Sequence, residues 1–352
     1  MKILITTLNL HYNKVNNALV DLLNNIDLKK HSVDLLTMER GELELTIDER
    51  INIIYYKDYM LMPSKFLYNF KRKHIVNDLY NQFRFAFKNI YDVAIAYYGD
   101  DNYVDMIPAS VKATKKIIWV HSIDKLNFSN KYDYFDNIVF TSKANMNIFN
   151  FKYPKYKDKL IFINNIIDYD KIIKKSKEKT NIKLSNGYNI INISNLNKEN
   201  NIDSIIDIHR KLLVKNKNIH TYIIGDGTYS YKIASKLRKY SITDSFILLG
   251  KQVNPYNILK QASLYLDVTN TDKYNNTLLE SIILDKPCIT NNITMYKEIS
   301  EFIPLNGIKY SDIDNMVSMV EKHIKNYQGH IPFDYKKYNK ENMKKVEDLI
   351  EK

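Results

Sequence analysis

Short apolar runs alternate with amphipathic segments along the chain. The apolar runs have the length of buried strands, and the segments between them place apolar residues at helical spacing. The pattern predicts strands at residues 3–8, 32–37, 51–56, 91–97, 116–121, 137–141, 160–163, 188–194, 221–224, 245–249, 264–268 and 288–290. It predicts helices at 16–25, 65–90, from 143 onward, and at 202–214, 231–240, 277–283 and 340–352. Strands that alternate with helices form parallel β-α-β units, so the predicted class is α/β with doubly wound parallel sheets.

The alternation stops at a polar, lysine-rich stretch, residues 171–187, and then restarts. A chain of 352 residues also exceeds what one core usually spans. We therefore predict two domains, residues 1–168 and 169–334, with a helix at about 335–352 packing back on the first. Open α/β sheets bind ligands at the carboxyl ends of their strands. The two predicted sheets would thus face a cleft that holds the ligand.

Composition fits a cytoplasmic globular protein. The hydrophobic fraction is 45%, and no apolar run reaches the roughly 18 residues that a membrane span needs. The sequence enters its first strand at once, without the pattern of a signal peptide. The single cysteine, Cys288, excludes an intramolecular disulfide, as expected for a reducing compartment.

The chain is basic, with a formal net charge of +12 that is spread over both halves. Such a surface suits anionic partners: nucleotide diphosphates, anionic lipid or nucleic acid. Lys, Asn, Ile and Tyr are abundant throughout, so coding bias in an AT-rich genome is an equal explanation. No nucleic-acid recognition motif accompanies the charge, and we expect no nucleic-acid partner. The histidines show no metal-ligand spacing, and no phosphate-loop lysine motif or nucleophile elbow occurs.

Two carboxylates near position 280 form the most specific motif. Asp272 falls in a predicted loop, and Glu280 falls about one turn into the helix that follows. A helix N-terminus offers unpaired N–H groups and a partial positive charge, so it can hold a phosphate. A carboxylate in that turn can accept hydrogen bonds from ribose hydroxyls, and one in the loop can reach a sugar. Taken singly, Glu280 could merely favour the helix dipole, and Asp272 could be a solvated loop acid.

This segment resembles the family 4 retaining glycosyltransferases of the GT-B fold, which build bacterial surface polysaccharides and glycolipids. The family carries Glu-Gly-x-Pro-x-x-x-x-Glu-Ala here. The chain keeps the spacing with Asp272 and Glu280-Ser281 but lacks the glycine and proline. Further matches are Asp285-Lys286-Pro287-Cys288-Ile289, Gly250 with Asn254-Pro255-Tyr256, Trp119-Val120-His121 as Trp-x-His, the strand and serine at Asn137-Ile138-Val139-Phe140-Thr141-Ser142, and the domain exit at Asn164-Asn165-Ile166-Ile167-Asp168.

The resemblance implies two Rossmann-like domains, with the acceptor on the first and a nucleotide-sugar on the second. It implies that Glu280 binds ribose, that the N–H groups of Thr277 and Leu278 bind the distal phosphate, and that Asp272 contacts the donor sugar. His121 would face that sugar, although a histidine at a strand end is more often structural. The remaining expected donor-binding positions are Asn195, Lys198, Asn200, Gly225, Gly250, Lys251, Asn254 and Lys273, and the acceptor-side positions are His11, Gly99 and Asp100. Gly225, in Gly225-Asp226-Gly227, is by itself equally consistent with a structural turn.

The expected reaction is metal-independent transfer, with retention, from a UDP-linked sugar to a hydroxyl of a glycan, lipid-linked or protein-linked acceptor. The chain departs from the family in its phosphate-binding loop. Where the family has Gly-Arg-x-x-x-x-Lys, Ser194 is followed by Asn195 and, five positions later, Asn200. Lys198, Lys251 or Lys273 could replace the lost cations. The alternative is a catalytically impaired subunit that binds an acceptor or a partner glycosyltransferase.

Residues 65–90 interleave basic and aromatic side chains with one acid, Asp78. A helix of this composition can lie on an anionic membrane. The segment therefore predicts peripheral contact with the inner face of the cell membrane. The competing interpretation is a helix that packs on the sheet and exposes a basic face to water.

Overall fold

The computed structural model consists of two compact units. Unit 1 contains residues 1–167 and 339–352, and unit 2 contains residues 168–338. The structure describes residues 1–56, 90–98, 102–121, 123, 130–198, 200–269, 276–300, 302–303, 308–326 and 331–352. The helix predicted at 65–90, with its proposed membrane contact, lies outside these residues.

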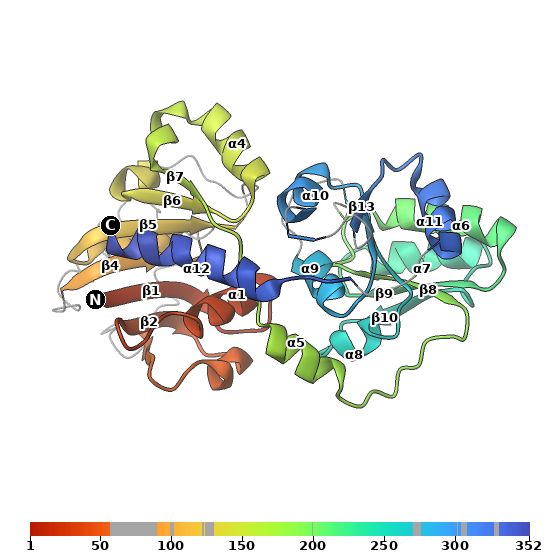
Figure 1. Ribbon diagram of the computed structural model, residues 1–352, viewed down its shortest axis with the longest axis horizontal. Helices are drawn as coiled ribbons and strands as arrows, with labels where there is room; N and C mark the ends of the chain where they lie inside the picture. The colour runs from red at the N-terminus through yellow and green to blue at the C-terminus, as the bar shows by residue number, and fades with distance from the viewer. Residues whose placement is uncertain are drawn as a thin grey trace. The chain divides into compact units, whose positions relative to one another are not determined.

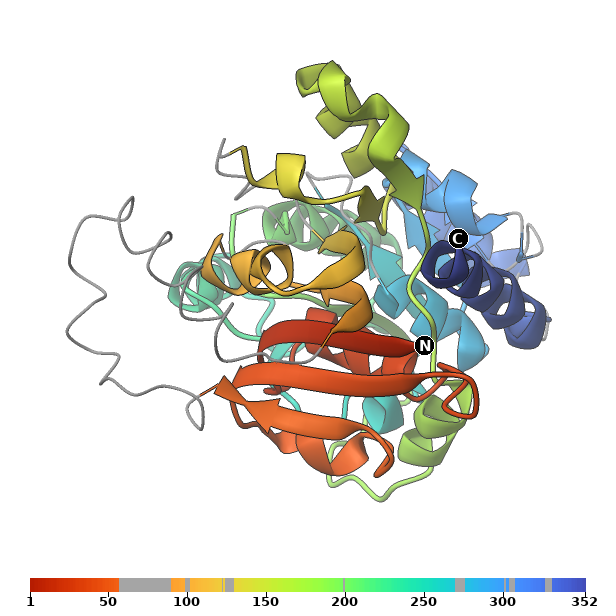
Figure 2. The ribbon, with the colours of Figure 1, turned by 90° about the vertical axis from the view of Figure 1, so that its left-hand side faces the viewer.

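A parallel sheet forms the centre of unit 1 (Figures 1 and 2). In its described part the strand order is β3-β2-β1-β4-β5-β6-β7. The strands are β1 (Lys2–Asn9), β2 (Ser32–Glu39), β3 (Asn52–Tyr55), β4 (Tyr91–Ala96), β5 (Ala113–Val120), β6 (Asn137–Phe140) and β7 (Leu160–Phe162). The helices are α1 (Lys14–Leu23), α3 (Asn102–Ser110), α4 (Lys143–Lys152) and α12 (Tyr335–Glu351), with 3-10 turns η1 (Glu42–Thr46), η3 (Asn130–Tyr134) and η4 (Pro154–Lys159).

Both faces of this sheet are apolar, as expected of a parallel sheet covered by helices on both sides. On one face, alternate residues of β1 and β4 such as Ile3 and Val93 pack with α1 and with Val346 of α12. The residues between them, such as Leu4 and Ala94, pack with α3 on the opposite face. Successive side chains of each strand thus pack alternately against the helices on the two faces of the sheet.

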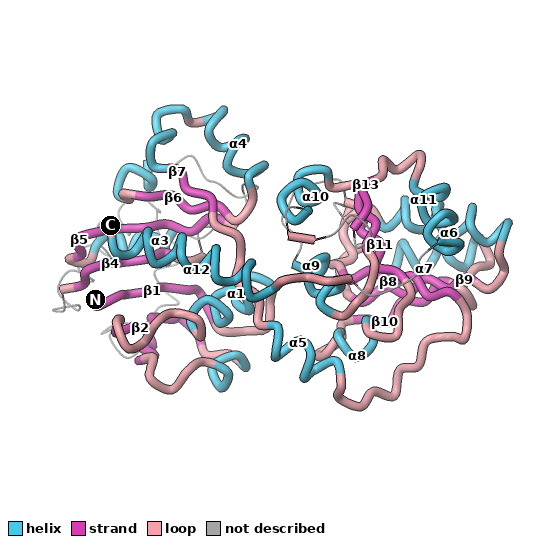
Figure 3. Tube along the Cα trace, in the orientation of Figure 1, coloured by secondary structure: helices cyan, strands magenta, loops and turns pink. Residues whose placement is uncertain are grey.

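Unit 2 repeats this architecture around a second parallel sheet, of order β10-β9-β8-β11-β12-β13. Figure 3 shows its strands flanked by helices. The strands are β8 (Tyr188–Ile193), β9 (Ile219–Ile224), β10 (Phe246–Gly250), β11 (Leu264–Asp267), β12 (Cys288–Thr290) and β13 (Ile308–Tyr310). The helices are α5 (Tyr169–Ser176), α6 (Ile202–Lys215), α7 (Ser230–Lys239), α8 (Tyr256–Leu259), α9 (Asn276–Ile283), α10 (Ile293–Ser300) and α11 (Met316–Asn326). The prediction of two doubly wound α/β sheets is confirmed.

The chain leaves unit 1 near Ile167 and re-enters it near Asn339. The Asn339 side chain donates to the Ile167 carbonyl at 2.7 Å and accepts from the Ile167 N–H at 3.1 Å. Just inside unit 2, the rings of Tyr169 and Tyr335 stack with centroids 3.7 Å apart. The two connections therefore run side by side.

Among the described elements, helices α3, α8, α10 and α11 and strand β13 were not predicted. Helix α3 contains Pro108, which ordinarily argues against a helix interior, but Val104 and Ile107 are fully buried against the sheet. Helix α10, strand β13 and helix α11 follow β12 in a part of the sequence with weak periodicity. Among the described residues, none of the helices is both long and apolar enough to cross a membrane.

Candidate functional site

The carboxyl edge of the unit 2 sheet carries most of the predicted donor-binding residues. All pairings in this sheet are parallel, so the loops after β8, β9, β10 and β11 emerge at the same edge. The strand order reverses between β8 and β11, because β8 is followed by β9 on one side and flanked by β11 on the other. Such a reversal is the usual ligand position in open α/β sheets.

The glycine turn after β9 is needed for close packing against the loop after β8. Gly225 has φ of +146°, and a Cβ there would lie 1.9 Å from the carbonyl oxygen of Ser194. A Cβ on Gly227 would lie 2.4 Å from the carbonyl oxygen of Leu196. The Asp226 carboxylate accepts from the Ser230 hydroxyl and the Gly227 N–H, and these bonds lower its pKa. The turn is thus a rigid support for the loop after β8.

The loop after β8 exposes two of the three predicted donor-binding residues. Asn195 and Lys198 are exposed. The Asn200 side chain instead donates to the Asn195 carbonyl at 2.7 Å, so it braces the loop. A hollow of about 150 Å³ lies beside the loop, lined by Asn197, Lys198, Asn201, Ile202, Asp203, Tyr229 and Ile233. Lys198 is therefore the positively charged side chain of this loop that a bound anion at the sheet edge could contact.

Glu280 is half-buried near the start of α9, where the sequence placed it. The hydroxyl of Tyr256, at the start of α8, donates to its Oε1 at 3.3 Å. Thr277 and Leu278 are buried, so they can offer backbone N–H groups rather than side chains to a ligand. Asn254 donates to the Lys175 carbonyl at 2.8 Å and to the Glu178 carboxylate at 2.7 Å, so it fastens the loop after β10 to the end of α5. In this arrangement its amide group is used within the protein, and its contact with the donor stays a prediction.

Gly250 ends β10 with φ of +68°, and nothing lies within 4 Å of a Cβ built there. Space at this position is open, and Lys251 beside it is exposed. Asp272 and Lys273, which we predicted to contact the donor, lie outside the described residues. So do Gly99 and Asp100, predicted on the acceptor side.

In unit 1, His121 follows β5 and is partly exposed. Its Nε2 lies 3.0 Å from the Tyr97 carbonyl, and its ring centroid lies 4.8 Å from that of Tyr97. A carbonyl can only accept, so Nε2 carries the proton and Nδ1 presents a lone pair. Burial lowers the pKa of His121 to about 4, and the bond to Tyr97 opposes this shift only partly. At neutral pH the imidazole is therefore a neutral hydrogen-bond acceptor.

We expect the His121 imidazole to titrate near pH 4, measured from its ring resonances in a two-dimensional NMR titration. The folded-state pKa lies below the ordinary histidine value of 6.5, so the unfolded chain binds this proton first as the pH falls. The stability that neutral His121 contributes is therefore complete above pH 6.5 and falls as the pH drops from 6.5 to about 4. His121→Gln should remove this component of acid sensitivity. A midpoint near 6.5 in the folded protein would contradict the neutral, partly buried imidazole described here.

Among the described residues, one cluster has a geometry that could accommodate a metal ion, but it serves to attach α12. Its members are His31, Glu347 and Glu351, with ligand atoms within 4.8 Å of one another. His31 Nε2 lies 2.8 Å from Glu347 Oε2, while its buried Nδ1 has no partner. A metal-bound histidine ordinarily donates from its other nitrogen, which this site does not allow. Metal-independent catalysis remains a prediction.

Residues 173–303, which include the carboxyl edge of unit 2, match the model of the family described as glycosyl transferases group 1. That part of the chain is similar to the group 1 glycosyltransferases, and the chain has the GT-B fold. An uncharacterized glycosyltransferase of Methanocaldococcus jannaschii is 24% identical over 261 residues, 67% of this chain and 62% of that protein. The O-antigen biosynthesis glycosyltransferase WclY of Escherichia coli is 25% identical over 191 residues, 53% of this chain and 51% of that protein. The matched part thus spans less than two thirds of either relative.

The fold of this chain also matches solved structures over most of its length. Anabaena HepE, crystallised in complex with UDP, superposes with a TM-score of 0.72, with 13% identity, 99% of this chain and 100% of that chain covered. WaaG, a glycosyltransferase involved in lipopolysaccharide biosynthesis, superposes with a TM-score of 0.61 over 92% of this chain and 90% of that chain, with 10% identity. At such low identity these likenesses establish the fold alone.

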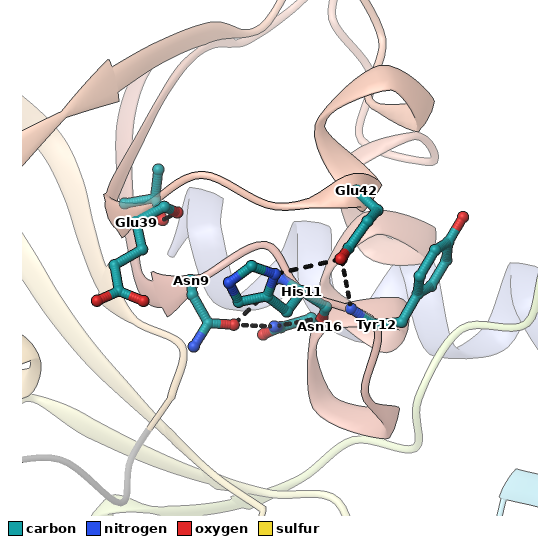
Figure 4. Close-up of polar contacts among 7 residues, drawn as sticks. Asn9, His11, Tyr12, Asn16, Glu39 and Glu42 are labelled. Atoms are coloured by element: carbon teal, nitrogen blue, oxygen red, sulfur yellow. Dashed lines mark hydrogen bonds and ion pairs between the residues drawn. The ribbon is translucent and has the colours of Figure 1, made fainter. Parts of the chain in front are cut away.

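Two polar contacts at these predicted sites were not predicted from the sequence. One is the bond from Tyr256 to Glu280; Tyr256 was noted only as part of a motif. The other is the pairing of His11 with Glu42, shown in Figure 4. His11 was predicted on the acceptor side, but Glu42 gave no signal, because the pairing depends on two neighbouring strands ending at the same edge.

Proposed function

We propose that this protein transfers a sugar from a nucleotide-sugar to an acceptor hydroxyl, with the nucleotide bound at the carboxyl edge of unit 2. The observation that carries the proposal is Glu280, a half-buried carboxylate near the start of α9 at the reversal point of the sheet. A carboxylate there can accept from both ribose hydroxyls while the first N–H groups of α9 face a phosphate. HepE, which shares the fold, was crystallised with UDP, and this supports a UDP-linked donor.

In the proposed reaction, the bond between the sugar C1 and the phosphate oxygen breaks, and its electron pair stays on the diphosphate. The acceptor oxygen bonds to C1 on the face that the diphosphate leaves, so configuration is retained. The acceptor proton passes to a donor phosphate oxygen. No protein nucleophile or metal is required, so the residues act by positioning and electrostatics. Neutral His121 would accept from a donor-sugar hydroxyl, and Asp272 would contact another. The acceptor hydroxyl would belong to a glycan, a lipid-linked or a protein-linked saccharide.

Positive charge for the leaving diphosphate would come from exposed Lys198 and Lys251, with Lys273 as a third candidate. Asn195 occupies the position of the family arginine and is also exposed. An arginine there could donate to the diphosphate without displacing a buried group.

We therefore expect Asn195→Arg to raise the turnover of UDP-sugar hydrolysis or transfer about 10-fold or more. One preorganised hydrogen-bond donor typically contributes about 100- to 1000-fold to the rate. The measurement is release of UDP across a panel of UDP- and GDP-sugars. Asp244→Asn, which changes the net charge equally at an exposed site before β10, should leave the rate unchanged. Equal rates for wild type and Asn195→Arg would contradict the idea that a missing cation limits this site.

The second candidate is a catalytically impaired GT-B subunit that binds an acceptor or a partner glycosyltransferase. Two asparagines favour this candidate, because neither provides a positive charge. They are Asn195 and Asn200, and the Asn200 side chain already donates to the Asn195 carbonyl. Calorimetry with UDP and UDP-sugars separates the two. Absence of heat at millimolar nucleotide would favour the subunit and contradict the transferase.

A further inference from the structure

Two loops of unit 1 bring a histidine and a carboxylate together at the carboxyl ends of β1 and β2. His11 follows β1, and Glu42 begins η1 after β2. Nδ1 of His11 lies 3.3 Å from Oε2 of Glu42, and the Tyr12 N–H donates to the same oxygen at 3.3 Å. In Figure 4 the imidazole lies between the Asn9 amide and the Glu42 carboxylate. Both side chains of the pair are accessible, with 53% and 57% of their surface exposed.

The backbone that carries the pair is fixed. The Leu43 N–H donates to the Leu10 carbonyl at 3.0 Å. A Cβ on Gly41 would lie 2.1 Å from the Leu10 carbonyl carbon, so the two loops touch through their main chains. Fully buried Asn16 donates to the Asn9 side-chain oxygen at 2.8 Å and to the His11 carbonyl at 2.9 Å. The exposed pair is therefore held in place before any ligand arrives, which lowers the entropy cost of binding.

The hydrogen bonds within the cluster determine which of its exposed atoms can donate and which can accept. The bonds from its own N–H and from His11 lower the pKa of Glu42, so its carboxylate is ionised at neutral pH and only accepts. In the neutral imidazole of His11, Nδ1 then carries the proton, which leaves Nε2 as an acceptor. The contacts from His11 and Tyr12 both go to Oε2 of Glu42, and in the described part of the chain no group donates to Nε2 of His11. The Asn9 amide adds a donor, because only its oxygen is used within the loop.

The charge of this cluster selects against anions. The carboxylates of Glu39 and Glu42 are both exposed here, and Figure 4 shows Glu39 beside Asn9. Like charges at such range disfavour a phosphate or a carboxylate ligand. A zinc ion would need four ligands, and the pair supplies two. Neutral hydroxyl groups, which donate and accept at once, match the two acceptors and one donor.

We propose that His11, Glu42 and Asn9 form a binding site for the hydroxyl groups of the acceptor saccharide. His11 Nε2 and Glu42 Oε1 accept from its hydroxyls, and Asn9 Nδ2 donates to one of them. The saccharide class rests on the transferase function proposed above, whereas the site is built from residues of unit 1 alone.

The test uses the full chain without nucleotide and follows the ring resonances of His11, assigned with His11→Gln. The probes are the methyl glycosides of glucose, galactose and N-acetylglucosamine, titrated to their solubility limits, and inorganic phosphate. We expect at least one glycoside to shift the His11 resonance in a saturable way and phosphate to leave it unchanged. A His11 resonance that no glycoside moves, or that phosphate saturates, would overturn the proposal.

Variants separate a binding role from a structural one. Glu42→Gln and His11→Ala should each weaken binding of that glycoside by about 10-fold, since each removes one hydrogen bond to the saccharide. In saturation-transfer NMR, His11→Gln should recover part of the affinity that His11→Ala loses, because an amide oxygen can still accept. Glu49→Gln, at an exposed acid outside the cluster, is the matched control and should bind like wild type. Unaltered affinity in Glu42→Gln would refute the assignment.

A parallel UDP titration keeps the two proposals apart. Binding of UDP without any response of His11 to glycosides would remove the acceptor site and leave the donor site intact. A His11 response without UDP binding would leave this saccharide site and remove the transferase.

Discussion

Replacing Glu280 with alanine is expected to weaken UDP binding about 10- to 100-fold, because hydrogen bonds to a charged group contribute about 1.5–3 kcal/mol. The carboxylate lies near the start of α9, where ribose hydroxyls would donate to it. Isothermal titration calorimetry of UDP against wild type and variant measures the change directly. Turnover of UDP-sugar should fall at least as far, since the donor must bind before it reacts.

Two further variants sharpen this prediction. Tyr256→Phe removes the hydroxyl that donates to Glu280 at 3.3 Å and should weaken UDP only several-fold, because the carboxylate itself remains. Asp244→Ala removes an exposed acid that precedes β10 and should bind UDP like wild type. If Glu280→Ala binds UDP as tightly as Asp244→Ala does, the ribose role is refuted.

Replacing Gly225 with alanine is expected to lower the unfolding free energy of unit 2 by about 3 kcal/mol or more. Its φ of +146° is nearly closed to side chains, and the new Cβ would lie 1.9 Å from the Ser194 carbonyl oxygen. The loop after β8 would have to move, so UDP binding should weaken too. For a unit of this size, such a loss lowers the melting temperature by about 6–12 °C, measurable by calorimetry or circular dichroism.

Gly250→Ala is the matched control for this clash. Its φ of +68° carries a similar left-handed penalty, of about 1–2 kcal/mol, but nothing lies within 4 Å of the new Cβ. We expect a smaller fall in melting temperature, by about 2–8 °C. Equal destabilisation by the two substitutions would mean that backbone strain alone, and not the contact with Ser194, requires glycine at 225.

The regular part of the fold could be predicted because buried parallel strands consist of short runs of apolar residues. Strands such as β8 and β9 were predicted to within two residues, as were helices α6, α7 and α9. Helix α3 was missed because Pro108 is tolerated where the sheet buries its neighbours. Tertiary burial, which overrides local preference there, has no signature in a single sequence.

The part of the candidate site that depends on residues close together in the sequence was predictable. Glu280 was placed near a helix start from its own neighbours, and it lies there. The contacts between distant side chains could not be predicted. Tyr256 and Glu280 are 24 positions apart in the sequence, and His11 and Glu42 are 31 positions apart. Such pairs form only when parallel strands bring their ends to one edge. Asn200 was predicted to bind the donor, but its side chain is used within its own loop.

The order of synthesis has consequences for the two cores. Unit 2 is one continuous segment, so all of its strands and helices are available once residue 338 has been made. Unit 1 begins to emerge first, but Val346, Leu349 and Ile350 of α12 complete its core. On the ribosome, one face of the first sheet is therefore covered by α1 but not yet by α12 while the second domain is made. Chaperones that shield apolar surface would therefore act mainly on the N-terminal half of this chain.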